Sequence, residues 1–318
     1  DRGGYDALIG FWTSVAGSPV LGDPLLEYLT ATMADYRERL FLQVMLAPDE
    51  MRRRYDTAGF PSFEDPTRAV VAMAALMGFG EAFAKGTAEA PNIPDFAPLP
   101  EGALGEHETK AVLAAAGLPM VPDRLVRSAV EAAAAAADSG APVAMKIASP
   151  DIRHKTEAGG VKLNVTAADA AAAYDAIVAS ARAHVTGAGI DGVLVSPMIA
   201  DGVDCILGAK IDPVFGPVVL FGLGGVFTEV LEDVSFRRAP FEEETAHEMI
   251  GELRGAAVLK GARGQSPADL EALARAISRL SLFAAAHGEA IASVEMNPLR
   301  ALPDRCLALD ALLVKKGA

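Results

Sequence analysis

A proline-rich stretch from Gly86 to Ala103 (GTAEAPNIPDFAPLPEGA) divides the chain. It contains four prolines, Pro91, Pro94, Pro98 and Pro100. Because proline lacks a backbone N–H and fixes φ, a continuous helix cannot form there, and an extended tether is favoured. The full length of 318 residues also suits more than one folded part. We therefore expect separate domains over residues 1–88 and 104–318, joined by a linker over 89–103.

The part before the linker alternates predicted strands and helices. Apolar runs at Tyr5–Trp12 and Leu40–Leu46 predict buried strands, and apolar residues four apart predict a helix over 24–37. A short helix is expected after Pro48. A longer helix is expected to begin at Asp65 and Pro66, where an N-cap residue precedes a proline. The inward face of the long helix is predicted to carry Val70, Met73, Ala74 and Met77. This order predicts a parallel α/β sheet, about half of a doubly wound domain.

The part after the linker mixes helices and strands in another order. Helices are expected near 106–116 and after Ser128, Thr166 and Asp269, where capping residues or apolar periodicity occur. Strands are predicted over 143–148, 161–165, 192–196, 203–211, 218–221, 292–296 and 307–310. The whole chain is therefore expected to be an α/β protein.

Charge and composition exclude several classes of function. The formal net charge of −14 disfavours binding to nucleic acid or to an anionic membrane surface. Gly, Pro and charged residues interrupt every apolar run before the ~20 residues that span a bilayer. The two cysteines, Cys205 and Cys306, lie far apart and form no disulfide framework. These features predict a soluble, cytoplasmic protein.

Lys146 ends the small apolar run Pro142–Met145 of a predicted strand. A lysine in that setting can direct its ammonium group into a cleft and hold a phosphate of a nucleotide. The alternative is a lysine on an edge strand that faces water.

A second candidate is His154, in the segment SPDIRHKTEAGGV from Ser149 to Val161. It stands between Arg153 and Lys155 and precedes a Gly159–Gly160 turn. A neutral imidazole beside cations can meet an anion and accept a phosphoryl group. Taken alone, a loop histidine is usually a solvated polar residue.

The segment FGLGGVFTEV, from Phe221 to Val230, places Gly222, Gly224 and Gly225 after a predicted strand. It lacks the G-K-[ST] of a phosphate-binding loop and the G-x-G-x-x-G spacing of dinucleotide sites. The glycines could form an anion cradle from backbone N–H groups, or simply a tight turn between strands.

Three oxygen-bearing side chains form the fourth candidate site. Glu295 and Asn297 lie two apart on a predicted strand and so share a face, and Asp310 on an adjoining strand could join them. Carboxylate and amide oxygens suit Mg²⁺ that bridges nucleotide phosphates. The alternative is a satisfied polar face on an edge strand.

Together, these segments resemble the ATP-grasp region of the NDP-forming acyl-CoA synthetases, the superfamily of ADP-forming acetate–CoA ligase and succinyl-CoA synthetase. The resemblance covers nearly all of residues 104–315, and its most specific parts are GLGGVF at 222–227 and EMNP at 295–298. GARG at 261–264, with Pro267 and Asp269, also matches. Residues 1–90, with Gly59-Phe60-Pro61, resemble the end of the flavodoxin-like CoA-ligase domain that precedes the ATP-grasp in fused members.

The resemblance implies roles for these residues. Lys146 would contact ATP phosphates, and Glu295, Asn297 and Asp310 would hold Mg²⁺. The hinge between ATP-grasp subdomains, roughly 118–195 and 196–318, would be Ser196, Pro197 and Met198, whose backbone would pair with adenine. Asp204 would lie near the ribose, where the family usually has Glu. His154 would relay a phosphoryl group, steadied by Gly222, Gly224, Gly225 and Arg237.

The family mechanism passes phosphate from ATP to an enzyme histidine, then to an acyl phosphate, and ends with a CoA thioester. The resemblance therefore implies ATP and Mg²⁺ as cofactors and CoA as a co-substrate whose site lies largely outside this chain. No histidine precedes His107, so we expect the main phosphohistidine on an upstream domain or a partner subunit, and we expect the protein to form an oligomer. The isolated chain would then bind ATP·Mg²⁺ without completing acyl-CoA synthesis.

Two other functions fit parts of this pattern. A carboxylate–amine ligase of the ATP-grasp type would use an acyl phosphate but would not need His154. The ligase-like regulatory region of a protein acetyltransferase would bind CoA or nucleotide without turnover. The resemblance leaves the carboxylic acid, and the choice between ATP and GTP, open.

Overall fold

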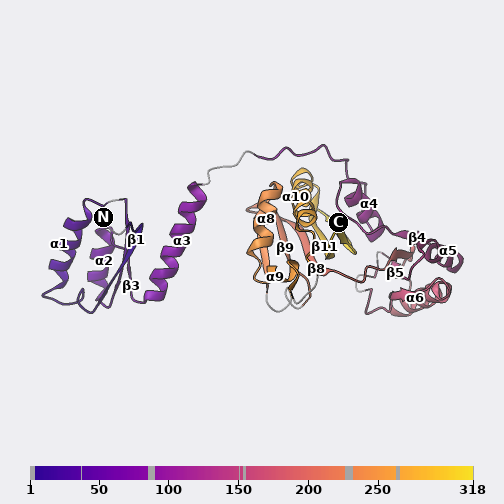
Figure 1. Cartoon of the computed structure of the whole chain (residues 1–318), viewed down its shortest axis with the longest axis horizontal. Coiled ribbons are helices and arrows are strands. Elements are labelled where there is room, and N and C mark those ends of the chain that lie inside the picture. The colour runs from indigo at the N-terminus through magenta and orange to yellow at the C-terminus, as the bar shows by residue number, and fades with distance from the viewer. Residues whose placement is uncertain are drawn as a thin grey trace. The chain divides into compact units, whose positions relative to one another are not determined.

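The computed structural model describes residues 4–36, 38–84, 90–149, 151–152, 155–225, 232–262 and 266–317. The chain forms two compact units, unit 1 over Asp1–Glu89 and unit 2 over Ala90–Ala318 (Figure 1). Each unit has its own hydrophobic core.

Unit 1 is a small parallel sheet with helices on both faces. The strands β1 (Ala7–Thr13), β2 (Leu40–Met45) and β3 (Ser62–Phe63) lie in the order β1-β2-β3. Alternate residues of β2 point to opposite faces: Met45 packs in a cluster around Tyr55, whereas Leu42 and Val44 pack with Ala69. The helices are α1 (Gly22–Met33), α2 (Asp49–Thr57) and α3 (Pro66–Ala84). The predicted parallel α/β sheet is confirmed, and β3 is an addition.

Helix α3 differs from its prediction. Ala69 is its one fully buried residue, and Ala72 and Met73 pack beside it against β2. Val70 and Met77, predicted to face inward, are more than half exposed, and Ala74 is exposed too. The reason is that a three-stranded sheet covers only the first turns of a 19-residue helix. By length and composition alone, α3 is long and apolar enough to cross a membrane, which corrects the expectation that every apolar run is too short.

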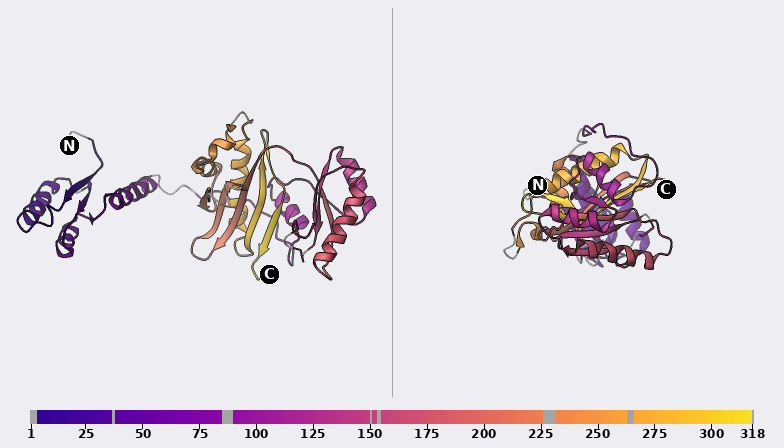
Figure 2. Two further views of the ribbon diagram at one scale, coloured as in Figure 1. Left: turned by 90° about the horizontal axis from the view of Figure 1, so that it is seen from below. Right: turned by 90° about the vertical axis from the view of Figure 1, so that its right-hand side faces the viewer.

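The first half of unit 2 is an antiparallel sheet covered by two helices. Its strands β4 (Arg124–Val126), β5 (Val143–Ala148), β6 (Val161–Val165) and β7 (Gly192–Pro197) lie in the order β4-β7-β5-β6. Helices α5 (Ala129–Ser139) and α6 (Ala170–His184) pack on one face of this sheet (Figure 2). The Ser128 hydroxyl accepts from the Glu131 N–H and so caps α5 as predicted.

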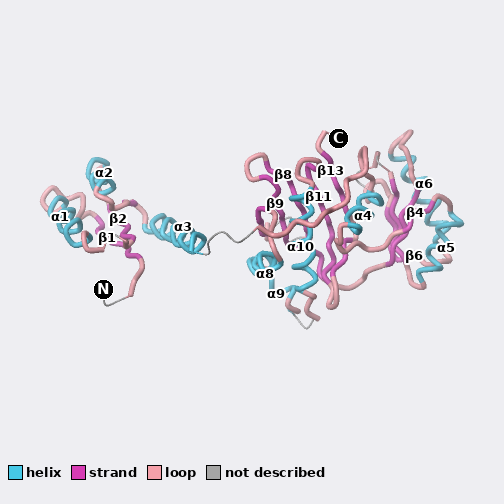
Figure 3. The backbone as a smooth tube through the Cα atoms, turned by 90° about the horizontal axis from the view of Figure 1, so that it is seen from above, coloured by secondary structure: helices cyan, strands magenta, loops and turns pink. Residues whose placement is uncertain are grey.

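The second half of unit 2 contains a larger antiparallel sheet. Its order is β10-β9-β8-β11-β12, with β13 also paired to β11. The bounds are β8 (Val203–Asp212), β9 (Gly216–Leu223), β10 (Val234–Arg238), β11 (Ile291–Ala301), β12 (Cys306–Ala308) and β13 (Ala311–Lys315). Three helices pack against it, α8 (Glu243–Glu252), α9 (Ala256–Leu259) and α10 (Leu270–Ala286). Helix α4 (Glu106–Ala115) lies between the two sheets (Figure 3).

The strand predicted over 307–310 is shorter than expected. β12 ends at Ala308 and β13 begins at Ala311, so Asp310 lies in the connection between them. The opposite strand explains the break, because Pro298 has no N–H to donate to a ladder. Only its carbonyl is used, as the acceptor for the Leu309 N–H at 2.9 Å.

The second half of the proline-rich stretch belongs to unit 2. Its described residues, from Ala90 onward, form no helix or strand, as predicted, but they are not a free tether. Phe96, Leu99 and Leu104 pack against the main core of unit 2. The Phe96 ring meets Phe283 of α10 edge to face at 5.6 Å, and Arg279 stacks over the same ring at 4.6 Å.

Candidate functional site

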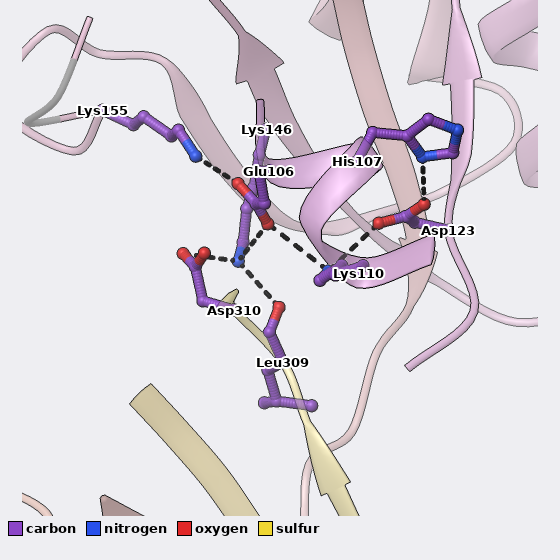
Figure 4. A network of polar contacts seen from close by, with 8 residues as sticks. All are labelled: Glu106, His107, Lys110, Asp123, Lys146, Lys155, Leu309 and Asp310. Atoms are coloured by element: carbon purple, nitrogen blue, oxygen red, sulfur yellow. Dashed lines mark hydrogen bonds and ion pairs between the residues drawn. The ribbon is translucent and has the colours of Figure 1, made fainter. Parts of the chain in front are cut away.

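Lys146 lies at the junction between the two sheets of unit 2. It sits on β5, which is flanked by β7 and β6, so it is not on an edge strand. Its Nζ donates to the Leu309 carbonyl at 3.1 Å and to Asp310 Oδ2 at 3.2 Å, and it lies 3.6 Å from Glu106 Oε1 (Figure 4). The side chain is 16% exposed. One ammonium group therefore joins β5, α4 and the β12–β13 connection.

Glu106, the first residue of α4, is the centre of this network. Its carboxylate is 5% exposed and faces three ammonium groups. Oε2 binds Lys155, while Oε1 lies 3.4 Å from Lys110 and 3.6 Å from Lys146. Burial alone would raise the pKa of Glu106, but attraction to these three lysines outweighs it and lowers the pKa to about 2. Glu106 is therefore ionised at any physiological pH.

A second buried carboxylate extends the network. Asp123, also 5% exposed, lies 3.1 Å from Lys110 Nζ and 2.6 Å from His107 Nδ1. Lys110 thus links Glu106 to Asp123 (Figure 4). The network balances three lysines against the carboxylates of Glu106, Asp123 and Asp310, which is what a buried cluster of charges requires.

The pKa shifts of Lys146 and Asp310 follow from this geometry. Burial would lower the pKa of Lys146, but Glu106 and Asp310 raise it above its ordinary value. Burial, with repulsion from Glu106, raises the pKa of Asp310 even though Lys146 and Lys155 oppose that change. An additional cation near Asp310 would therefore stabilise its ionised form.

A polar cavity of about 580 Å³ lies next to the network. It is bounded by the start of α4, by β4 and its flanks, and by the end of β5. Glu106, Asp123 and Lys155 line it together with Arg127 and Ser149.

The predicted hinge residues lie where the chain passes from one sheet to the other. Ser196 is buried and pairs with Ala144, and Pro197 ends β7 opposite Val143. The Met198 N–H donates to the Pro142 carbonyl at 3.2 Å. The next strand, β8, already belongs to the second sheet, so the position suits a hinge.

The predicted glycines are held closely against neighbouring strands. A Cβ on Gly222 would lie 2.8 Å from the Asp233 carbonyl oxygen, and one on Gly224 would lie 3.1 Å from Asp204. The Gly224 N–H donates to the Asp204 carbonyl at 2.7 Å. Gly225 has a positive φ of 63°. Close packing thus accounts for Gly222 and Gly224, and their role as an anion cradle stays a prediction.

Asp204 and Arg237 are each held by an ion pair. Asp204 Oδ1 accepts from Arg300 Nε at 2.6 Å. Arg237, on the edge strand β10, donates to both carboxylate oxygens of Glu252, one of them at 3.0 Å. The described contacts of Arg237 lie within β10 and α8, whereas Lys146 contacts α4 and the β12–β13 connection.

The predicted Mg²⁺ ligands are partly brought together. Asn297 Nδ2 donates to Glu295 Oε1 at 3.2 Å, so the two side chains share a face as predicted. Asp310 lies opposite Asn297, because its neighbour Ala311 pairs with Met296. Within the described ranges, the structure forms no group of three or more His, Cys, Asp or Glu side chains that could hold a metal ion. The three-residue Mg²⁺ site therefore stays a prediction.

His154 lies outside the described residues, and Lys155 is the first described residue after it. Sequence reasoning missed Glu106, Lys110 and Asp123. The spacing of Glu106 and Lys110, four apart on a helix, is the one local signal that could have indicated an ion pair. Nothing local indicates that Lys155 contacts Glu106, because the two residues are 49 apart in the chain.

Comparisons with known proteins agree with this architecture. Residues 99–314 match the model of the ATP-grasp domain family. The beta subunit of ADP-forming acetate–CoA ligase I from Pyrococcus furiosus is 41% identical over 212 residues, which are 66% of this chain and 91% of that subunit. ADP-forming acetate–CoA ligase I from Archaeoglobus fulgidus is 36% identical over 277 residues, 84% of this chain but 40% of that protein. The chain thus spans well under half the length of that relative.

A third relative has known structures. The dinucleotide-forming acetyl-coenzyme A synthetase 1 of Ca. Korarchaeum cryptofilum, in complex with coenzyme A, Ca-AMPCP and HgCl⁺, is 39% identical. It superposes with a TM-score of 0.65 over 67% of this chain and 93% of that chain. Another structure of the same protein holds coenzyme A and Mg-AMPPCP, with its phosphohistidine segment pointing towards the nucleotide-binding site; the TM-score is 0.59 at 37% identity, over 67% and 93% of the two chains.

Proposed function

The chain belongs to the ATP-grasp family and, within it, to the NDP-forming acyl-CoA synthetases, and from that premise we propose that it is the ATP-binding, phosphoryl-transferring portion of an ADP-forming acid–CoA ligase. The overall reaction would convert a carboxylate, CoA and ATP into acyl-CoA, ADP and phosphate through a phosphohistidine. Unit 1 would be the end of a flavodoxin-like CoA-ligase domain, and unit 2 the ATP-grasp domain with subdomains over roughly 118–195 and 196–318.

One observation carries this proposal: Lys146 and Asp310 meet at 3.2 Å from opposite halves of unit 2. A phosphate-binding cation and a metal-binding carboxylate must approach the same nucleotide from both sides if it is held between two subdomains. Phosphoryl transfer depends on such positioning and on neutralising the charge of the phosphates.

Each of the predicted site residues would have its own role in binding or phosphoryl transfer. Lys146 would bind nucleotide phosphates, and the backbone at Ser196, Pro197 and Met198 would pair with adenine. Asp204 would lie near the ribose. His154 would carry the phosphoryl group on an imidazole nitrogen. The glycines Gly222, Gly224 and Gly225 would then hold that group with Arg237, once Arg237 leaves Glu252.

The proposed metal ligands are Glu295, Asn297 and Asp310. Their oxygen atoms suit Mg²⁺, and the raised pKa of Asp310, caused by burial and by Glu106, fits a carboxylate that a metal ion would stabilise. When bound, Mg²⁺ would bridge nucleotide phosphates and reduce their negative charge. Two of the relatives named above support nucleotide, metal and CoA as ligands, because one is ADP-forming and the other was seen with coenzyme A and Mg-AMPPCP.

We further propose that the CoA site and the main phosphohistidine lie on other domains or on a partner subunit. The Pyrococcus furiosus relative supports this, since it is named as the beta subunit of its ligase. A small carboxylic acid would be the acyl substrate, the assembly would be an oligomer, and its setting would be the cytoplasm.

The comparisons favour this function over a carboxylate–amine ligase, since the curated relatives described above are CoA ligases. The decisive test is phosphorylation of the chain. We would incubate it with Mg²⁺ and γ-labelled ATP, quench in base, and look for an acid-labile label in the wild type and in His154→Ala. Label that disappears in His154→Ala supports the proposal. Nucleotide binding without label in the presence of the upstream partner would favour a regulatory region without turnover.

A further inference from the structure

Glu106 brings together two lysines that come from different segments. Lys146 is on β5, whereas Lys155 lies in the segment between β5 and β6. Each oxygen of the Glu106 carboxylate faces one of these two ammonium groups. Figure 4 shows the carboxylate between them. Without an anion between them, two neighbouring ammonium groups would repel each other.

The geometry points to Glu106 as a positioning residue that holds Lys146 and Lys155 as one cationic pair, and to Lys155 as a second ligand for nucleotide or transferred phosphate. This inference rests on the proposed function, in which Lys146 contacts phosphate. It adds Lys155 as a binding residue and assigns to Glu106 a role that acts through the two lysines.

Three features of Glu106 favour this role over simple helix stabilisation. The N-terminal turn of α4 is already closed by Glu108, which accepts from the Gly105 N–H at 2.9 Å. Glu106 is buried, so its contacts with lysine are shielded from water. Its Oε1 lies 3.4 Å from Lys110 and 3.6 Å from Lys146 but has no hydrogen-bond partner among the described residues, so it attracts both ammonium groups through charge.

Asp123 provides a matched control within the same network. Both carboxylates are 5% exposed and both lie beside Lys110. Asp123 contacts Lys110 and His107, whereas Glu106 contacts Lys110, Lys146 and Lys155. Asp123→Asn should therefore disturb the buried charges as Glu106→Gln does, but it should not release the two phosphate-facing lysines.

The test is the reactivity of each lysine toward N-hydroxysuccinimidyl acetate, measured by peptide mass spectrometry on the full chain. We expect Glu106→Gln to raise the labelling of Lys146 and of Lys155 by about tenfold, because each lysine loses one charge-assisted contact. Lys162, an exposed lysine on β6, should not change. Asp123→Asn should leave Lys146 and Lys155 as in the wild type. Glu106→Asp, which keeps the charge on a shorter side chain, should give intermediate labelling of both and serves if Glu106→Gln does not fold.

Several outcomes would overturn the inference. These are a rise at only one of the two lysines, no rise in either Glu106 variant, or an equal rise in Asp123→Asn. Adding Mg·ATP separates this inference from the proposed function. If Mg·ATP protects both lysines in the wild type, the result supports this inference and the proposed function. If it protects Lys146 alone, Lys155 is rejected as a ligand. If Mg·ATP protects neither lysine while the Glu106 variants still expose both, the positioning role stands and the proposed function fails.

Discussion

Helices α3 and α10 are similar in length and apolar content, yet they are packed very differently. α10 has 17 residues, ten of them buried, and it covers the large sheet of unit 2. α3 has 19 residues, of which only Ala69 is fully buried. The two helices differ in pattern, because α10 concentrates its apolar residues on one face whereas α3 is apolar all round, and they differ in the size of the sheet beside them. Apolar content indicates that a helix can be buried, and the size of the neighbouring sheet decides how much of it is.

The largest expected effect tests this contrast directly. Phe283→Ala on α10 should lower the free energy of unfolding of unit 2 by about 3–5 kcal/mol, because it leaves a cavity beside Phe96 and His287. Phe83→Ala on α3, where the residue is 82% exposed, should change the free energy of unfolding of unit 1 by less than about 0.5 kcal/mol. Urea denaturation of both variants measures the two changes. Equal losses would show that α3 is packed in solution.

The second prediction compares carboxylates in the two units. The Arg52 guanidinium lowers the pKa of Asp49 at the surface of unit 1, whereas three lysines lower that of buried Glu106 in unit 2. A carboxylate whose pKa is lower in the folded state than in the unfolded state stabilises the fold at pH values above its unfolded pKa. This stabilisation is lost as the pH falls through the folded pKa. Unit 2 should therefore lose on the order of 3 kcal/mol between about pH 4.5 and 2, and Glu106→Gln should abolish this part of the dependence.

Unfolding by urea at pH 5 and at pH 3 provides the measurement. Glu101→Gln is the matched control, since Glu101 is exposed and five residues earlier in the same segment. It should follow the wild-type curve. A Glu106→Gln protein with the full wild-type acid dependence would refute the buried ion pairs as its cause.

The third prediction places nucleotide affinity in unit 2. Lys146→Met should weaken binding of Mg·ATP by about 10–100-fold, through loss of a charged donor to phosphate. Adenosine, which lacks phosphates, should bind equally to wild type and variant. Lys162→Met on the neighbouring strand β6 is the control and should bind Mg·ATP normally. Isothermal titration measures all three, and an equal loss for adenosine would mean that the fold, rather than phosphate binding, has changed.

The smallest expected effect concerns a helix cap. Asp269 accepts from the Ala272 N–H at 2.9 Å at the start of α10, whereas the residue before α1 in unit 1 makes no side-chain cap. Asp269→Ala should cost about 1 kcal/mol in unit 2. Asp304→Ala, at an exposed position in the turn between β11 and β12, should cost much less. Thermal unfolding of both variants measures the two changes. Equal shifts of the unfolding temperature would mean that the loss of the Asp269 cap does not explain the effect.

The sequence was most informative where local pattern and burial coincide. The strands at 143–148 and 161–165 were predicted with the bounds that the structure has, because compact apolar runs there are bounded by turn residues. Asp310 was misplaced into a strand because the interrupting effect of Pro298 acts from the opposite strand. β10 and α8 were not predicted at all, since neither has a strong apolar period.

The candidate site was predictable only in part for a related reason. Lys146 and Asp310 could each be chosen from local context, but their contact joins residues 164 apart. Glu106 was missed because an acidic residue at the start of a helix is adequately explained by the helix dipole. Its importance depends on three lysines, two of which are distant in sequence and converge only in the folded chain.

The packing of Phe96 beneath Arg279 defines where the two units can be separated. A protein made from the first helical residue of unit 2 would lack this ring and would expose Phe283 and His287 to water. A piece of the chain that keeps the complete core of unit 2 therefore begins near Ala90, because the extended segment covers Phe283 of α10. Any insertion or cleavage meant to change the spacing of the units belongs before that residue.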